Sequence, residues 1–484
     1  MDHDEIEKLI EPHFSLDLHK EKYELVEQDA ECLLSHSRFD LAFKLFYLNV
    51  KSKNENLANY IYSEHIRAFS LGKFDEPGNE EKNSLKKFIE DFNTTFNSIE
   101  TFGFDSAKTI IPLSKNGSIS NGAHRVASAI YLDKKVTCVE LDTENHIYDY
   151  DFFYKRGVSS EVLDIIATTF IEYTNNLHIA FLWPTGINKD EEIKKTIPNI
   201  VYKKTIKLTP NGAHNLLSQI YYGEEWLGSV EDDFKGSKGK LVECFKTFDS
   251  FDVIAFQANS LKDVLVIKDN IRELFNIGKH SVHITDTKEE ALRVARTVFN
   301  ENTLHFLNYA KPNKYLSTHK KIDEFKAFLF KNKIEVEDTL IDSSLILSCY
   351  GLREAKDTDF FYYKNNEIKF NVEDINIHDE ELKYYKSEKE ELIYNPKNYF
   401  YFNDIKFISF EQLYKMKTLR AEEKDNNDCS IMEAMLENNR LKELTAKLKQ
   451  KILYFKIKLK IESISFLSNL GIYELIRKIL KGPR

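Results

Sequence analysis

The sequence predicts a multidomain α/β (α+β) protein, and three observations support this fold class. At 484 residues the chain is longer than one hydrophobic core usually organises, so we expect several domains. Apolar residues make up 42% of the chain and charged residues 30%, which is typical of a soluble globular protein. Short apolar runs of strand length alternate with segments in which apolar residues recur at helical spacing.

Residues 1–100 are expected to form a helical region. Apolar residues recur at helical spacing through 41–69. Glu76-Pro77-Gly78 breaks this pattern before a further helix predicted at 84–96. Glu76 and Lys82, beside the break, are candidates for an acid/base and a phosphate ligand. The alternative is that they are a helix cap and a solvated charge.

The next segment, 101–158, predicts a strand at 109–113, a helix at 123–132 and a strand at 136–141. Asn121-Gly122-Ala123-His124-Arg125 opens the helix. N–H groups in the first turn of a helix lack intrahelical partners and attract anions, and an arginine binds two phosphate oxygens at once. The segment therefore predicts a phosphate-binding turn.

This order of elements, over about 105–145, resembles ParB and sulfiredoxin-like domains, whose motif places a glycine just before a His-Arg pair. The resemblance implies that Asn121, Gly122, His124 and Arg125 bind the phosphates of a nucleotide. Some members of the family are kinases of small hydroxy compounds, and others bind CTP and clamp DNA. The alternative is a structural turn, in which Asn121 caps the helix and His124 is a satisfied, partly buried histidine.

Residues 159–318 are expected to form an α/β domain. Apolar strands are predicted at 179–183, 253–256 and 282–284, with helices predicted at 261–275 and 288–299. Strands that alternate with helices favour a largely parallel sheet.

The most informative part of the chain lies within 319–436. Ser343 and Ser344 begin a short apolar run, which turns and then re-enters a strand that carries Asp357 and Asp359. Side chains two residues apart in a strand project from the same face. Two carboxylates on one face suit a divalent cation that holds the phosphates of a nucleotide.

This pattern resembles the nucleotidyltransferase fold over about 320–436. The family signature is a small-residue pair, a short helical run and then Asp-x-Asp on a strand. The resemblance implies that Ser343 and Ser344 cradle phosphate and that Asp357 and Asp359 are catalytic and bind Mg²⁺. The chain departs from the family at Ser343, where a glycine is usual. The alternative is a solvated acidic hairpin.

The same family usually supplies a third carboxylate from a neighbouring strand. Three residues compete for this role here, and we favour Asp374 as the third catalytic carboxylate over Glu373 and Asp404. A downstream amphipathic segment, 407–428, is similar to the helical end of the fold. The basic residues expected to contact the nucleotide are Arg353, Lys417 and Arg420.

The final segment, 437–484, is a basic amphipathic tail. From residue 440 onward it has twelve Lys or Arg against three Glu, interleaved with aliphatic residues. A helix at 463–480 could lie on an anionic membrane, bind a partner or dock on the body of the protein. The alternation of lysines with apolar residues over 455–461 is strand-like and interrupts the helical pattern.

Several classes are excluded or disfavoured by composition. The five cysteines are scattered, the N-terminus lacks an apolar core and no apolar run is long enough to span a bilayer. We therefore expect a cytoplasmic protein, with the tail allowing peripheral association at the inner membrane face. A net charge of −10 disfavours a general nucleic-acid binder.

Together these features predict a nucleotide-dependent phosphoryl- or nucleotidyl-transferase of surface polysaccharide or glycoconjugate biosynthesis. It would use Mg²⁺ and a nucleoside triphosphate, ATP or CTP, and a small-molecule or lipid-linked sugar acceptor. One alternative is a ParB-like, nucleotide-gated DNA-binding or antitoxin-type protein without turnover, although 160–240 is acidic and aromatic rather than basic. Another is a degenerate transferase fold that only binds its ligand.

Overall fold

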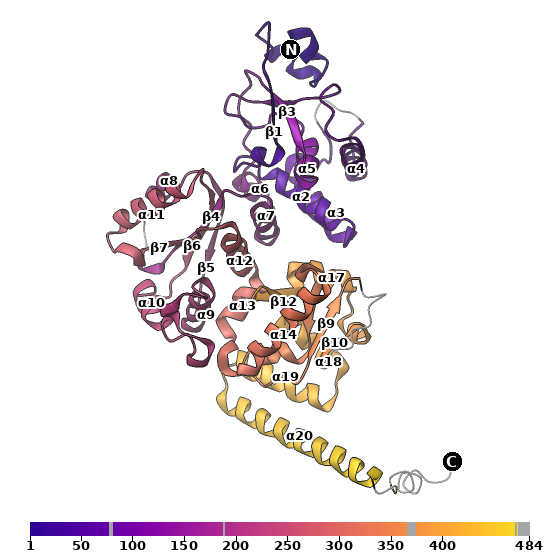
Figure 1. Cartoon of the computed structure of the whole chain (residues 1–484), viewed down its shortest axis with the longest axis vertical. Coiled ribbons are helices and arrows are strands. Elements are labelled where there is room, and N and C mark those ends of the chain that lie inside the picture. Colours follow the sequence, from indigo (N-terminus) through magenta and orange to yellow (C-terminus); the bar gives the residue numbers. More distant parts are fainter. Residues whose placement is uncertain (77–80, 187–188, 365–373, 470–471, 473–484) are drawn as a thin grey trace.

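The protein is a mixed α/β, multidomain molecule with three small sheets (Figure 1). The computed structural model describes residues 1–76, 81–186, 189–364, 374–469 and 472. Two short helices pack against the first unit: α1 (His3–Glu7), whose Ile6 shares a core cluster with Val139, and α6 (Tyr150–Lys155), whose Phe153 contacts Phe43.

The first unit has a three-stranded sheet in the order β1-β3-β2. Strand β1 (Leu25–Asp29) runs antiparallel to β3 (Lys135–Glu140), and β2 (Ile111–Leu113) runs parallel to β3. The helical region expected at 1–100 therefore also contains one strand, β1. The sheet joins that region to 101–158, because β1 contributes an edge strand to the same layer. The helices of this unit are α2 (Asp40–Val50), α3 (Glu55–Phe69), α4 (Leu85–Phe102) and α5 (Ala123–Tyr131).

Helix α2 is buried along almost its whole length, since it is packed by α3, α5 and α7 (Ser160–Glu172). Two charged residues, Asp40 and Lys44, lie on this buried helix one turn apart. Charged side chains in such a position need partners, and these partners form part of the candidate site described below.

The second unit has a four-stranded sheet in the order β5-β6-β4-β7. Every strand pair in it is antiparallel, so the expectation of a largely parallel sheet was wrong. The alternation of helices and strands does not fix strand direction, because neighbours in this sheet are not joined by single right-handed crossovers. The strands are β4 (Leu177–Leu182), β5 (Ile200–Ile206), β6 (Phe251–Gln257) and β7 (Val282–Ile284). The helices are α8 (Asp190–Thr196), α9 (Pro210–Ile220), α10 (Ser237–Cys244), α11 (Leu261–Phe275), α12 (Lys288–Val298) and α13 (Glu301–Tyr309).

The third unit has a five-stranded mixed sheet in the order β10-β9-β8-β12-β11. Its central strand β8 is antiparallel to β9 and parallel to β12. The strands are β8 (Thr339–Asp342), β9 (Thr358–Tyr362), β10 (Ile375–Ile377), β11 (Tyr399–Phe402) and β12 (Ile405–Ile408). The helices are α14 (Leu316–Asn332), α15 (Ser344–Cys349), α16 (Leu382–Tyr385), α17 (Lys389–Tyr394), α18 (Phe410–Arg420) and α19 (Glu423–Leu436).

A single helix, α20 (Arg440–Asn469), packs on α19 and extends away from the rest of the molecule (Figure 1). The strand-like alternation of lysines at 456–460 was a wrong signal, because these residues are helical. Among the described helices, none has the length and apolar content to cross a bilayer.

Candidate functional site

The largest cavity described, about 610 Å³, lies in the first unit at the N-terminus of α5. All four phosphate-binding residues predicted in this unit line it: Asn121, Gly122, His124 and Arg125. Glu76 and Lys82, the acid/base and phosphate candidates, line it as well, and their side chains form an ion pair of 2.9 Å. Residues that are far apart in the sequence therefore meet around one hollow.

Gly122 begins α5 in a left-handed conformation, with φ of +90°. A Cβ atom at this position would lie 2.8 Å from Nη2 of Arg125 and 2.9 Å from Cδ1 of Ile111. The backbone angle therefore favours glycine, and a larger residue would also have to displace the ends of the Arg125 and Ile111 side chains. The first-turn N–H groups of α5 have no partner within the helix and lie at the cavity wall.

Arg125 is held at the cavity wall by a carboxylate. Its Nη2 donates to Oε1 of Glu11 at 2.8 Å, and its Nη1 donates to the hydroxyl of Thr109. Burial lowers the pKa of Arg125 below its usual range, although Glu11 partly opposes this. A phosphate could replace Glu11 as the anionic partner, because the guanidinium is already oriented at the site.

His124 is fixed by two aromatic neighbours. Its ring stacks on Phe92 with centroids 4.6 Å apart, and its Nε2 lies 2.7 Å from the hydroxyl of Tyr62. Burial, reinforced by Lys44 and Lys82, lowers the pKa of His124 well below its usual value. The histidine is therefore a neutral, hydrogen-bonding group at neutral pH rather than a cation.

The floor of the cavity is a buried charge cluster that the sequence analysis did not find. Asp40 accepts from Arg38 through both carboxylate oxygens, at 2.8 and 2.9 Å, and from Nζ of Lys44 at 3.0 Å. Burial opposes ionisation of Asp40, but Arg38 and Lys44 hold its pKa well below the usual value. The sequence feature that could have revealed this cluster is the pair Asp40 and Lys44, which lie four residues apart in an otherwise apolar helix.

Lys44 also determines which ring nitrogen of His65 carries the proton. Nζ of Lys44 lies 3.0 Å from Nε2 of His65, and an ammonium group can only donate, so Nε2 accepts and the ring proton is on Nδ1. Burial lowers the pKa of His65 well below its usual value. Within the described part of the chain, this buried Nδ1 has no hydrogen-bond partner.

The cavity has a small excess of positive charge. Five basic side chains and four carboxylates line it, and both histidines are neutral for the reasons above. Most of the basic groups already have a fixed orientation through a carboxylate or carbonyl partner. Such a hollow can hold a multiply charged anion without rearranging the backbone.

The predicted Asp-x-Asp pair lies in the third unit, at the edge where β9 begins. Asp342, the last residue of β8, pairs directly with Asp359 on β9. Directly opposed residues share a face, and Asp357 precedes Asp359 by two positions, so the three carboxylates are on one side. Burial raises the pKa of Asp359, and the nearby Asp357 and Asp342 raise it further. Asp342 was not predicted, although it directly precedes Ser343.

Two side chains of this edge satisfy Asp342. Nδ1 of His378 lies 2.8 Å from one carboxylate oxygen, and the hydroxyl of Tyr385 donates to the other. Burial opposes protonation of His378, but Asp342, Asp359 and Glu381 together raise its pKa above the usual value. His378 was also missing from the predicted set.

The first residue of the serine pair has an unusual backbone conformation. Ser343 has φ of +66° and ψ of −130°, a conformation that glycine favours. Ser344 begins α15, and its hydroxyl donates to Asp357 at 3.2 Å. The serine pair therefore supports the Asp pair directly.

The candidates for a third carboxylate lie in different places. Asp374 stands beside Asp357 at the start of β10, with an exposed side chain and φ of +66°. Asp404 precedes β12, which runs parallel to β8, so it lies at the opposite end of the sheet from Asp342. Glu373 lies outside the described residues. Throughout the described ranges, no three His, Cys, Asp or Glu side chains are grouped to hold a metal ion.

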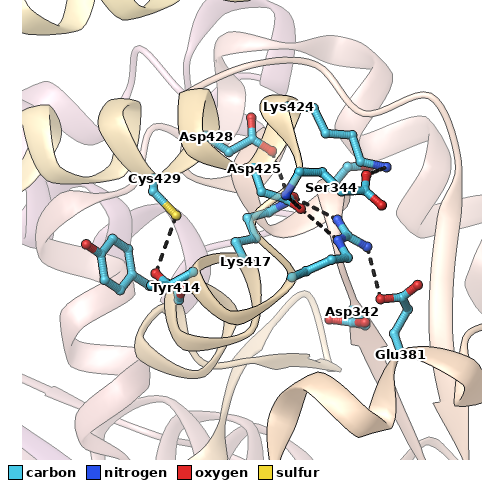
Figure 2. A network of polar contacts seen from close by, with 12 residues as sticks. Asp342, Ser344, Glu381, Tyr414, Lys417, Lys424, Asp425, Asp428 and Cys429 are labelled. Carbon is cyan, nitrogen blue, oxygen red and sulfur yellow. Dashed lines mark hydrogen bonds and ion pairs between the residues drawn. The ribbon is translucent and has the colours of Figure 1, made fainter.

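The three basic residues predicted to contact nucleotide are members of a buried ion network, of which Figure 2 shows Lys417 beside Asp425 and Asp428. Arg353 binds both oxygens of Asp428, at 2.7 and 2.8 Å, and Lys417 lies 2.9 Å from the same carboxylate. Arg420 binds both oxygens of Asp425. The side chain of Lys417 is only 1% exposed. These contacts join α18 to α19 without a ligand, so a phosphate-binding role for the three residues stays a prediction.

The chain matches no protein-family model, and comparisons with curated proteins and with solved structures also produce no match.

Proposed function

We propose that the protein is a nucleotide-dependent transferase that binds the phosphates of a nucleoside triphosphate in the cavity of the first unit. One observation carries the proposal: the glycine-started N-terminus of α5 faces the buried Arg38–Asp40–Lys44–His65 cluster across one hollow. Its volume of about 610 Å³ is in the range of small-molecule sites. Phosphate binding at a helix N-terminus needs a close backbone approach, which Gly122 permits.

In this proposal the chain's own groups have separate tasks. The first-turn N–H groups of α5 and Arg125 bind the phosphate oxygens, and Arg125 exchanges Glu11 for the ligand. Lys82, at the mouth of the cavity, offsets charge on the transferred group. His65, which Lys44 holds through Nε2, forms part of the cavity wall beside the bound nucleotide.

The reaction that fits this arrangement is phosphoryl transfer to a hydroxyl group. The acceptor oxygen forms a bond to the γ-phosphorus, the bond from that phosphorus to the bridging oxygen breaks, and the nucleoside diphosphate leaves. Glu76 is the candidate base that takes the hydroxyl proton, because its carboxylate lines the cavity mouth.

A second candidate reaction, nucleotidyl transfer, is favoured by the Asp342–Asp359 register in the third unit. Asp357 and Asp359 would hold Mg²⁺, which would supply positive charge to offset that of the leaving pyrophosphate. Mg²⁺ commonly needs only one or two carboxylates besides phosphate and water, so two aspartates fit it. Ser344 and Asp342 would keep the two aspartates in place. Asp374 remains the proposed third carboxylate.

Product analysis separates the two sites. The protein is incubated with MgATP or MgCTP, and release of nucleoside diphosphate and of pyrophosphate is measured in wild type, Arg125→Gln and Asp357→Ala/Asp359→Ala. The proposal expects diphosphate release that Arg125→Gln abolishes and the double variant retains. Pyrophosphate release that only the double variant abolishes would transfer the activity to the third unit.

The acceptor remains a proposal drawn from the sequence, namely a sugar or lipid-linked sugar. The competing proposal of a nucleotide-gated DNA-binding protein predicts a different result in a gel-shift titration. Tight, salt-sensitive binding of duplex DNA in the presence of CTP, with no product formed from either nucleotide, would favour it over the transferase.

A further inference from the structure

Helix α20 has one face that packs on the body of the protein. Ala446, Gln450 and Leu453 are buried on this face. Nε2 of Gln450 donates to Oδ1 of Asp428 at 3.1 Å, which ties the helix to the ion network below α19. At 3.6 residues per turn, these three positions fall within an arc of about 60°.

The opposite face of α20 is an exposed apolar stripe. Its members are 46 to 78% exposed, and their spacing of three or four residues, with one step of seven, keeps them within an arc of about 80°. This arc is centred roughly 170° from the buried face. The apolar stripe consists of Leu441, Leu444, Leu448, Ile452, Phe455, Leu459 and Phe466.

Lysines border this apolar stripe on both sides. In the helical projection, Lys447, Lys451 and Lys458 lie along one border, and Lys449 and Lys456 lie along the other. Residues 440–469 contain eight basic and two acidic residues, whereas the whole chain has a net charge of −10. The positive charge is therefore concentrated along the exposed apolar face.

The charge around the apolar stripe distinguishes between two possible binding partners, a second copy of α20 and a lipid surface. In a pair of α20 helices, parallel or antiparallel, the lysine borders of one copy would face those of the other, and like charges repel. An anionic lipid surface satisfies both features, because the apolar stripe enters the acyl boundary while the lysines reach the phosphate layer. A helix of 30 residues is about 45 Å long and can lie along such a surface.

We propose that α20 is a membrane-surface helix that docks the protein on an anionic bilayer through the apolar stripe and its lysine borders. The Ala446–Leu453 face stays packed on α19, so docking requires no unfolding of the helix. This inference does not depend on the proposed reaction, because it rests on a different part of the molecule.

Flotation of the full-length protein with vesicles tests the proposal. The probes are vesicles of 30% phosphatidylglycerol in phosphatidylcholine and vesicles of phosphatidylcholine alone. We expect binding to the anionic vesicles, a loss of roughly fivefold in affinity for each lysine removed from a border, and weakening by salt. Leu448→Ser/Phe455→Ser/Leu459→Ser should weaken binding at least tenfold.

The matched control is Leu265→Ser/Val266→Ser, which removes two exposed apolar side chains from α11 instead. It should float as wild type does, and circular dichroism should show unchanged helix content in both variants. Equal binding to neutral vesicles, or unchanged binding by the triple variant, would overturn the proposal. So would a concentration-dependent dimer that the triple variant abolishes, since a second copy would then be the occupant.

Discussion

Replacing Gly122 by alanine separates backbone strain from loss of the phosphate site. The φ of +90° at Gly122 costs an L-residue about 1 to 2 kcal/mol. The new Cβ would also meet Arg125 and Ile111 at 2.8 and 2.9 Å. Because both contacts are with the ends of flexible side chains, we expect the overpacking to cost about 1 kcal/mol, the lower end of its usual range. We therefore expect a loss of roughly 2 to 3 kcal/mol in the unfolding free energy of the first unit.

Gly117→Ala is the matched control. Gly117 has φ of +80°, and a Cβ there would meet no atom within 4 Å, so only the backbone strain applies. Chemical unfolding gives the stability of both variants, and isothermal titration with MgATP and MgCTP gives their affinities. We expect Gly122→Ala to bind nucleotide at least roughly tenfold more weakly, since a lost charge-assisted hydrogen bond costs about 1.5 to 3 kcal/mol. Wild-type affinity in Gly122→Ala would refute the assignment of the phosphate site to α5.

Three further predictions concern the other units. Ser343→Gly should raise the unfolding free energy by about 1 kcal/mol by relieving a positive φ, whereas Ser344→Gly should lower it; a decrease in the first variant would contradict the strain argument. Asp428→Ala should cost about 3 to 5 kcal/mol in urea unfolding because Arg353 and Lys417 lose a buried carboxylate; a change below about 1 kcal/mol would mean that the network is not structural. Burial raises the pKa of Asp164 to about 6, so the folded state retains a proton that the unfolded chain releases above about pH 4. Wild type should therefore lose about 2.4 kcal/mol relative to Asp164→Asn as the pH rises from 4 to 7, and parallel pH profiles would contradict this.

Local patterns predicted several elements because their causes are local. The helix expected at 261–275 has the same ends as α11, where Ser260 caps the first turn and Asn276 ends the helix in a left-handed conformation. Strand β1 was missed because only two of its five residues, Leu25 and Val26, are apolar. Its pairing partner β3 also lies about 110 residues away in the sequence. Strand direction in the second unit depends on the same kind of long-range pairing.

The candidate sites show the same division. Gly122 and the Asp357/Asp359 pair could be proposed as site residues because glycine turns and carboxylates two residues apart are recognisable sequence patterns. Asp40 and His65 were not predicted, because the role of a polar residue inside an apolar helix depends on contacts with residues that are distant in the sequence. Asp342 was missed since its role depends on the register with β9.

The most direct test of the central claim is a crystal structure of the full chain with Mg²⁺ and a non-hydrolysable triphosphate. We predict phosphate density within hydrogen-bond distance of the first-turn N–H groups of α5, with Arg125 released from Glu11. A nucleotide bound only beside Asp357 and Asp359, with Arg125 still on Glu11, would contradict the account.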